Sequence, residues 1–185
     1  FGRNVPCVSI AHQYLITETI PELEALSHKV PLVRDPDSSY YLRQEKNGLL
    51  LGPYEFKCRA HWVTDGDPMP DDFSFQLYND DLERLEWYID DACKRVPILG
   101  SVGITRVVNG PIPYAPDGLP LVGQMPGVPN AFEACVFTFG IVQAGGAGKL
   151  LAEIIVEGES ETDPWAVDPR RFTDHVDQKY TLAKA

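Results

Sequence analysis

The sequence lacks any excess of positive charge and any long apolar run. Its 185 residues carry 16 Lys and Arg against 27 Asp and Glu, so the formal net charge is −11 at pH 7. This charge repels the backbone of nucleic acids and the anionic face of a membrane. No apolar run approaches the roughly 18 to 20 residues of a membrane-spanning helix, and no charged-then-apolar leader opens the chain. We therefore expect a soluble protein that binds neither nucleic acid nor a membrane.

Cysteine is scarce, and the sequence has no metal-binding pattern. The cysteines lie far apart without a C-x-x-C pair: Cys7, Cys58, Cys93 and Cys135. This spacing indicates neither a zinc site nor a disulfide framework, so a reducing compartment is the simplest expectation. It would be the cytoplasm of a bacterium or the mitochondrial matrix of a eukaryote. His28, His61 and His175 lack the spacing of a metal triad, and we expect no bound metal.

Several catalytic motifs are also missing. No G-x-G-x-x-G is present, and the phosphate-loop motif fails because Leu150 follows Lys149. The sequence has neither G-x-S-x-G nor S-x-x-K, which excludes the common serine hydrolases. Trp62, Trp87 and Trp165 are too widely spread to form a stacking platform for single-stranded nucleic acid.

The length predicts one compact unit with a single substantial core. The chain begins at Phe1 without a Met and ends directly after a segment, Asp174 to Ala183, that starts a new element. We interpret the sequence as a fragment of a longer protein.

The first third of the chain predicts strands and a hairpin. Val5 to Ile20 is rich in β-branched and aromatic residues and predicts a strand, after which Pro21 to Ser27 predicts one or two helical turns. Strands at Tyr40–Gln44 and Leu49–Leu51 flank the segment 45–48, where an Asn-Gly pair supplies the positive φ angles of a tight turn. Residues 64–72 are rich in Asp, Gly and Pro and predict a surface loop.

The middle of the chain predicts a helix, a strand and a long loop. Residues 80–96 have a helical apolar stripe, with Asp80 and Glu83 at capping-box spacing. Ser101 to Val108 predicts a strand, and Asn109 to Gly127 is crowded with Gly and Pro and predicts an extended loop. Asp117 is expected to serve as a turn former within that loop.

The most informative stretch is an apolar run, Phe132 to Phe139, that breaks at Gly140. It restarts as a periodic helix after further glycines, Gly145, Gly146 and Gly148, and ends at Gly158. The order predicts strand, glycine turn and helix. Free N–H groups at the start of such a helix favour a cofactor or an anion, whereas close packing of the helix on a sheet explains the glycines equally well.

The longer motifs resemble the C-terminal part of the FAD-dependent amine oxidoreductases of the D-amino-acid-oxidase superfamily, in the dimethylglycine and sarcosine dehydrogenase branch. The matching C-terminal segments are Gly110–Gly123, Phe139–Ile141 and Ala144–Lys149. The matching N-terminal segments, in the order of that branch, are His12–Tyr14 with Thr17, Pro31–Asp35, Tyr41–Arg43 and Gly52–Glu55. The resemblance covers nearly the whole chain.

The resemblance implies an α+β fold, with a mainly antiparallel sheet flanked by helices and the C-terminal strand and helix of an FAD domain. It divides the chain into a substrate-binding part, a flavin-domain part and a lead-in to a folate-binding domain, over residues 1–108, 109–160 and 161–185. The Rossmann-type unit that binds the FAD pyrophosphate in the family has no counterpart in this sequence.

The same resemblance implies site residues. It places flavin contacts at Thr138, Phe139, Gly140, Ile141 and Val142, with Gly145 and Gly146 as second choices. By the same resemblance, His12 and Tyr41 lie beside the substrate as catalytic residues, and Arg43 is a candidate for binding the substrate carboxylate. Without the resemblance, a lone His in a strand and a Tyr on a hairpin indicate structural roles more often than catalytic ones.

The function implied by the resemblance is oxidation of the N-methyl C–N bond of an amino acid such as dimethylglycine or sarcosine, with electrons passing to FAD. The final electron acceptor, a protein or oxygen, stays open. A downstream domain that binds tetrahydrofolate would capture the one-carbon unit. Two alternatives remain: the same chemistry on glycine, proline or D-amino acids, or a non-catalytic interaction domain.

Overall fold

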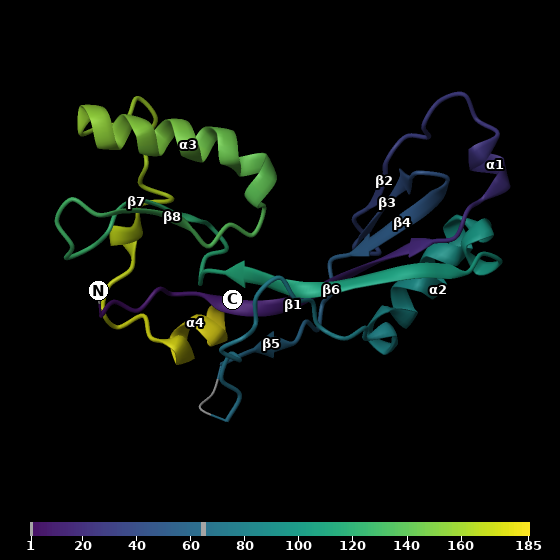
Figure 1. Ribbon diagram of the computed structural model, residues 1–185, viewed down its shortest axis with the longest axis horizontal. Coiled ribbons are helices and arrows are strands. Elements are labelled where there is room, and N and C mark those ends of the chain that lie inside the picture. Colours follow the sequence, from purple (N-terminus) through teal and green to yellow (C-terminus); the bar gives the residue numbers. More distant parts are fainter. Residues whose placement is uncertain (1, 64–65) are drawn as a thin grey trace. The chain divides into compact units, whose positions relative to one another are not determined.

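The computed structural model describes residues 2–63 and 66–185 (Figure 1). Thr64 and Asp65, the first residues of the expected surface loop, lie outside the described residues. In contrast to the single unit expected from the length, the chain forms two compact units. The sheet unit comprises Ala11–Arg59 and Asp72–Pro111. The other unit, which we call the α3 unit after its helix α3 (Gly140–Glu157), comprises Phe1–Ile10, Ala60–Asp71 and Ile112–Ala185.

Within the described residues, six strands form one antiparallel sheet in the order β2-β3-β4-β1-β5, with β6 paired to β1. The strands are β1 Val8–Thr17, β2 Val33–Asp35, β3 Tyr40–Glu45, β4 Gly48–Pro53, β5 Ala60–His61 and β6 Ile104–Tyr114. Both β1 and β6 contribute residues to both units.

One face of the sheet is buried in the sheet unit because alternate residues of a strand point to opposite faces. In β3, Tyr40 and Leu42 are buried while Tyr41 and Arg43 are half-buried. The core on the buried face is made of Leu15, Ile20, Tyr40, Leu42, Leu49, Leu51, Leu85 and Ala92. The last two belong to η1, Leu82–Leu85, and α2, Glu86–Arg95. On the opposite face the residues of β1 and β3 are half-buried, whereas β4 is buried along its whole length.

The hairpin between β3 and β4 forms where the sequence predicts it, but by a different turn. Lys46 takes the positive φ, at 53°, whereas Asn47 and Gly48 do not. Gly48 is needed for another reason: a Cβ on it would lie 2.7 Å from the carbonyl oxygen of Glu18. The short α1 helix, Pro21–Glu24, confirms the predicted helical turns before Ser27.

The predicted helix over 80–96 is correct in place and wrong at its start. Its first turn is the 3₁₀ helix η1, and no side chain caps it, so the predicted capping box of Asp80 and Glu83 does not form. Tertiary contacts set the start instead, because the backbone of Asp81 is hydrogen-bonded to the side chain of Gln13. A further 3₁₀ turn, η2 Pro97–Gly100, follows the helix.

The long loop predicted from Asn109 to Gly127 contains strand residues, which corrects that prediction. β6 continues to Tyr114 through Pro111 and Pro113. Prolines spaced two apart lose N–H groups on the same side of the strand, so an edge strand tolerates them. The turn after β6 forms as predicted, with Gly118 at φ 72° and the carboxylate of Asp117 accepting the N–H of Leu119.

In the α3 unit, the helix α3, Gly140–Glu157, lies across the hairpin of β7, Leu121–Gln124, and β8, Phe132–Cys135 (Figure 1). The strand β8 ends at Cys135, earlier than the predicted end at Phe139. The helix α3 begins at Gly140 rather than after Gly148. Gly158 ends it as predicted, in the left-handed conformation with φ 84°.

The C-terminal segment adds η3, Pro169–Arg171, and the short α4, Gln178–Lys184, which falls in the region predicted to start a new element. Arg171 ties this segment to the loop after β6: its Nε donates to Asp117 at 2.7 Å. Among the helices in the described part of the chain, none is long and apolar enough to cross a membrane.

Candidate active site

The half-buried face of the sheet unit brings together a histidine and two tyrosines. His12 lies on β1 between the buried Ala11 and Gln13, so its ring points away from the core. The His12 ring contacts Tyr54, with centroids 6.5 Å apart, and Tyr54 contacts Tyr41 at 5.8 Å. Two residues predicted to be catalytic therefore meet around Tyr54, although they are distant in the sequence.

Gly52 determines where the Tyr41 ring lies. Tyr41 and Gly52 are directly paired between β3 and β4. A Cβ built on Gly52 would overlap the ring and the hydroxyl of Tyr41, so that the ring lies directly over the Gly52 backbone. Only glycine permits this approach, and the Tyr41 ring lies 5.8 Å from the ring of Tyr54, centroid to centroid.

The electrostatics of the cluster favour uncharged side chains. Burial lowers the pKa of His12, and the nearby positive charge of Arg84 lowers it further. Burial raises the pKa of Tyr41, and the neighbouring Tyr54 adds to this rise. At neutral pH, His12 is therefore a proton acceptor and Tyr41 a hydrogen-bond donor.

Two arginines lie near this cluster. Arg43, predicted to bind a substrate carboxylate, pairs with Glu45 through Nη1 and Oε2 at 2.5 Å. Arg34 pairs with Tyr41 across β2 and β3 and lies 5.2 Å from the ring centroid of Tyr54. Sequence reasoning did not single out Arg34, because its place beside Tyr41 depends on the register of a three-residue strand.

The predicted flavin contacts form the start of α3. Thr138 donates its hydroxyl to the carbonyl of Pro113 at 2.9 Å, so that donor is already used within the unit. Phe139 precedes the helix and is half exposed, and Ile141 and Val142 in its first turn are 95% and 83% exposed. The first turn has no acidic residue, and its N–H groups have no partner within the helix.

The glycines of α3 are not explained by packing within the described residues. A Cβ built on Gly145, Gly146 or Gly148 meets no described atom within 4 Å. Glycine inside a helix costs roughly 1 kcal/mol relative to alanine. Within the described residues, α3 packs on β7 and β8 through residues other than these glycines, so both explanations that the sequence left open, a ligand and close packing, stay open for them.

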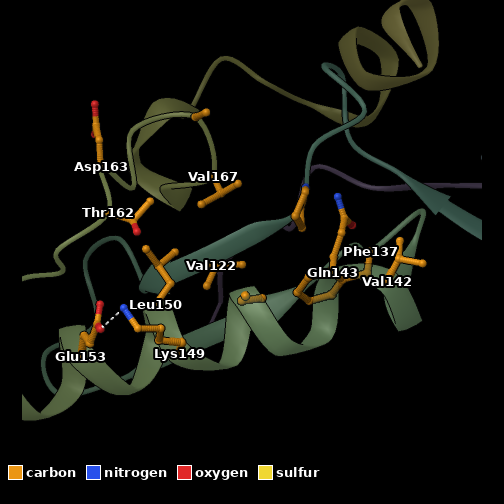
Figure 2. Close-up of a pocket in the computed structure, with 14 residues that line it drawn as sticks. Val122, Phe137, Val142, Gln143, Lys149, Leu150, Glu153, Thr162, Asp163 and Val167 are labelled. Atoms are coloured by element: carbon orange, nitrogen blue, oxygen red, sulfur yellow. Dashed lines mark ion pairs between the residues drawn. The ribbon is translucent and has the colours of Figure 1, made fainter.

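Beside α3 lies a cavity of about 420 Å³, lined entirely by residues of the α3 unit. Figure 2 shows side chains of α3 on one side and of the segment 162–167 on the other, with Val122 between them. Val142 and Gly146, both predicted flavin contacts, line it. Lys149 and Glu153 form an ion pair at its rim with Nζ and Oε1 2.6 Å apart.

The start of α3 fits an electron-rich ring edge. In the part of the chain that the structure describes, it offers N–H groups without a partner inside the helix, the positive end of the helix dipole and no acidic side chain in its first turn. Within the described residues, no group of His, Cys, Asp and Glu side chains is arranged to hold a metal ion.

A family model described as DAO, FAD-dependent oxidoreductase, matches residues 1–154. The chain belongs to the DAO family. It is 44% identical over 188 residues to mitochondrial dimethylglycine dehydrogenase of Mus musculus, covering 100% of this chain and 21% of that protein. It is 37% identical over 180 residues to mitochondrial sarcosine dehydrogenase of Mus musculus, covering 95% of this chain and 19% of that protein.

The DAO fold is also found among solved structures. L-proline dehydrogenase from P. horikoshii superimposes with a TM-score of 0.70 at 23% identity, over 93% of this chain and 42% of that chain. These comparisons confirm the predicted family and the α+β fold class. The chain spans about a fifth of the length of the curated relatives.

Proposed function

We propose that this chain is the substrate-binding and C-terminal flavin portion of an FAD-dependent enzyme that oxidises an N-methyl amino acid such as dimethylglycine or sarcosine. The observation that carries the proposal is the cluster of His12, Tyr41 and Tyr54 on the half-buried face of the sheet unit. The 44% identity to dimethylglycine dehydrogenase supports the choice of substrate class.

The cluster suits an N-methyl amine. An amine must lose its ammonium proton before a hydride can leave the adjacent carbon, because the nitrogen lone pair forms the C=N bond. His12, uncharged at neutral pH, accepts that proton at a ring nitrogen. The faces of Tyr41 and Tyr54 attract a methylated ammonium group by cation–π interaction. Arg43 binds the substrate carboxylate in this proposal.

Bound FAD supplies the hydride acceptor. In the proposal, Thr138, Phe139, Gly140, Ile141 and Val142 hold the edge of its ring system, with Gly145 and Gly146 lying beside it. The dipole of α3 favours the negative charge that a reduced flavin carries.

The proposal extends to the rest of the protein. It assigns residues 1–108 to substrate binding, 109–160 to the flavin domain and 161–185 to the lead-in of a domain that binds tetrahydrofolate. The FAD pyrophosphate is then held by chain upstream of Phe1, and the electron acceptor stays open.

The test is flavin bleaching. The full flavin-loaded protein that contains this chain is mixed anaerobically with dimethylglycine, sarcosine, glycine, proline and D-alanine, and flavin absorbance is followed. We expect dimethylglycine or sarcosine to bleach the flavin faster than the other amines. Faster bleaching by proline, glycine or D-alanine would show that the enzyme acts on that amine instead. If no amine bleached the flavin, the proposed oxidation would be wrong and the alternative of a non-catalytic interaction domain would be favoured.

A further inference from the structure

An arginine and a glutamate form a buried pair next to the strand that presents His12. Arg84 lies on η1, and Glu55 lies two residues after the end of β4. Their side chains are 18% and 2% exposed, and Arg84 Nε lies 3.2 Å from Glu55 Oε2. Arg84 Nε also lies 3.3 Å from the carboxylate of Asp81. Arg84 thus joins two acidic residues from different elements.

The same residues bind the backbone next to His12. Gln13 is fully buried; its Nε2 donates to the carbonyl of Asp81 at 2.7 Å, and its Oε1 accepts the Asp81 N–H at 3.2 Å. The N–H of Gln13 donates to Glu55 Oε1 at 3.2 Å. Since β4 ends at Pro53, the Glu55 side chain takes the place of a strand partner. Glu55 and Asp81, the ion-pair partners of Arg84, therefore hold the segment of β1 that carries His12 through their hydrogen bonds to Gln13.

Stability alone is a poor explanation for this pair. In the part of the chain that the structure describes, Glu55 Oε2 and Arg84 Nε and Nη2 are buried and form no hydrogen bond. A buried ion pair with incomplete hydrogen bonding commonly recovers little more than its cost of desolvation. Burial raises the pKa of Glu55, and the charge of Arg84 opposes that rise. The same positive charge adds to the lowering of the His12 pKa by burial.

We propose that Arg84 is a positioning residue for the amine oxidation, which keeps the His12 imidazole in place and in its proton-accepting form. This inference rests on the proposed function. When substrate binds, the ammonium N–H bond breaks, its electron pair stays on nitrogen, and the imidazole lone pair forms the new N–H bond. The substrate C–H bond then gives its electron pair to FAD as hydride, and the nitrogen lone pair completes an iminium.

The groups around His12 come from several elements. Tyr54 contacts the imidazole ring and Tyr41 lies against Tyr54. Tyr14 follows on the same face of β1. Arg84 acts from η1, where Glu55 and Asp81 are its ion-pair partners. Arg34 lies 5.2 Å from the centroid of the Tyr54 ring. Arg84 is the cation that lowers the pKa of His12, so its removal tests the proposal.

The test uses the full flavin-loaded protein with Arg84→Met, Arg84→Gln and the charge-preserving Arg84→Lys. Deuterium exchange at the imidazole C2, read by peptide mass spectrometry, measures the pKa of His12 without relying on activity. We expect this pKa to rise by about one unit in both neutral variants, because a nearby positive charge is lost. Arg84→Lys should stay close to wild type. Lys94→Met, which removes an exposed cation on α2, should change nothing.

Activity gives the second readout. The rate of flavin reduction by dimethylglycine should fall as His12 becomes protonated. In Arg84→Met and Arg84→Gln, the low-pH limb of the pH–rate profile should therefore shift to higher pH by about one unit, as the pKa of His12 does. The limiting rate at high pH should change little. A purely structural role would lower the rate equally at all pH values.

The outcomes separate the two proposals. If dimethylglycine bleaches the wild type and the His12 pKa is unchanged in the neutral variants, the inference about Arg84 is wrong and the proposed function stands. If no N-methyl amine bleaches the wild type, the proposed function fails, and the role of Arg84 in this reaction fails with it. Two neutral variants are used so that misfolding of one leaves the other to decide.

Discussion

Single residues determine the geometry of the candidate active site. Tyr41 is placed by the absence of a side chain on Gly52, and His12 is placed by the buried neighbour Gln13. Neither partner would be recognised as functional from its own type, because glycine in a strand and a buried glutamine are both common structural residues. Their importance follows from what they contact.

The first prediction concerns Gly52. Gly52→Ala should move the Tyr41 ring off the strand, since a Cβ there overlaps it. We expect flavin reduction by the N-methyl substrate to slow by about 10- to 100-fold, as for other misplacements of roughly 1 Å. Stopped-flow absorbance measures the rate.

Gly100→Ala is the matched control, because its Cβ would meet Cys93 Sγ at an ordinary 3.8 Å. This variant should reduce its flavin at the wild-type rate. An unchanged rate in Gly52→Ala would show that the position of Tyr41 does not matter for the reaction.

At the scale of elements, the helix α3 contains glycines that lower its stability relative to alanine. Its Gly145, Gly146 and Gly148 face open space in the described chain. Ile141 and Val156 on this helix are also highly exposed. A helix that keeps glycines where alanine would stabilise it is typical of a surface that another group must approach closely.

The second prediction separates these effects. Gly145→Ala should stabilise the isolated chain by about 0.5 to 1 kcal/mol in urea unfolding, because the new methyl group meets no neighbour. In the full protein the same change should weaken FAD binding about tenfold, since the added Cβ enters the surface assigned to the cofactor.

Ala144→Gly, one residue earlier in α3, is the control. It should destabilise the isolated chain by about 1 kcal/mol and leave FAD binding unchanged. Equal FAD affinity in Gly145→Ala and wild type would remove Gly145 from the cofactor surface.

At the scale of the whole molecule, the chain divides into two units that each carry one part of the proposed chemistry. His12, Tyr41 and Arg43 belong to the sheet unit, whereas the start of α3 belongs to the other. Neither unit contains a motif for the pyrophosphate of a dinucleotide.

The third prediction follows from that division. Isothermal titration of the isolated 185-residue chain with FAD should give binding too weak to saturate at ~100 µM, because one helix start holds only the ring edge. The full protein, titrated after removal of its flavin, is the positive control. Tight binding by the isolated chain would contradict the proposed division of the cofactor site.

Local signals predicted a large part of the secondary structure. The strand before Pro21, the place of the hairpin between β3 and β4 and the stop of α3 at Gly158 follow from residue type, because side-chain alternation and turn residues act over a few residues. The positive φ of the hairpin turn falls on Lys46 and not on the predicted Asn-Gly pair. The predictions that failed involve distant partners. η1 begins where Gln13 binds Asp81, and β6 continues through its prolines because it pairs at an edge.

The sequence by itself determined the family, the α+β class, the order of strand and helix around Gly140, and the candidate residues His12 and Tyr41. These features depend on motifs and on periodicity, both of which are defined by residues close together in the sequence. Only the tertiary structure decided that Tyr54 joins these two residues, that Gly52 supports Tyr41, and that the charge of Arg84 acts on His12. Those relations depend on strand register and burial, and both arise from contacts between residues far apart in the chain.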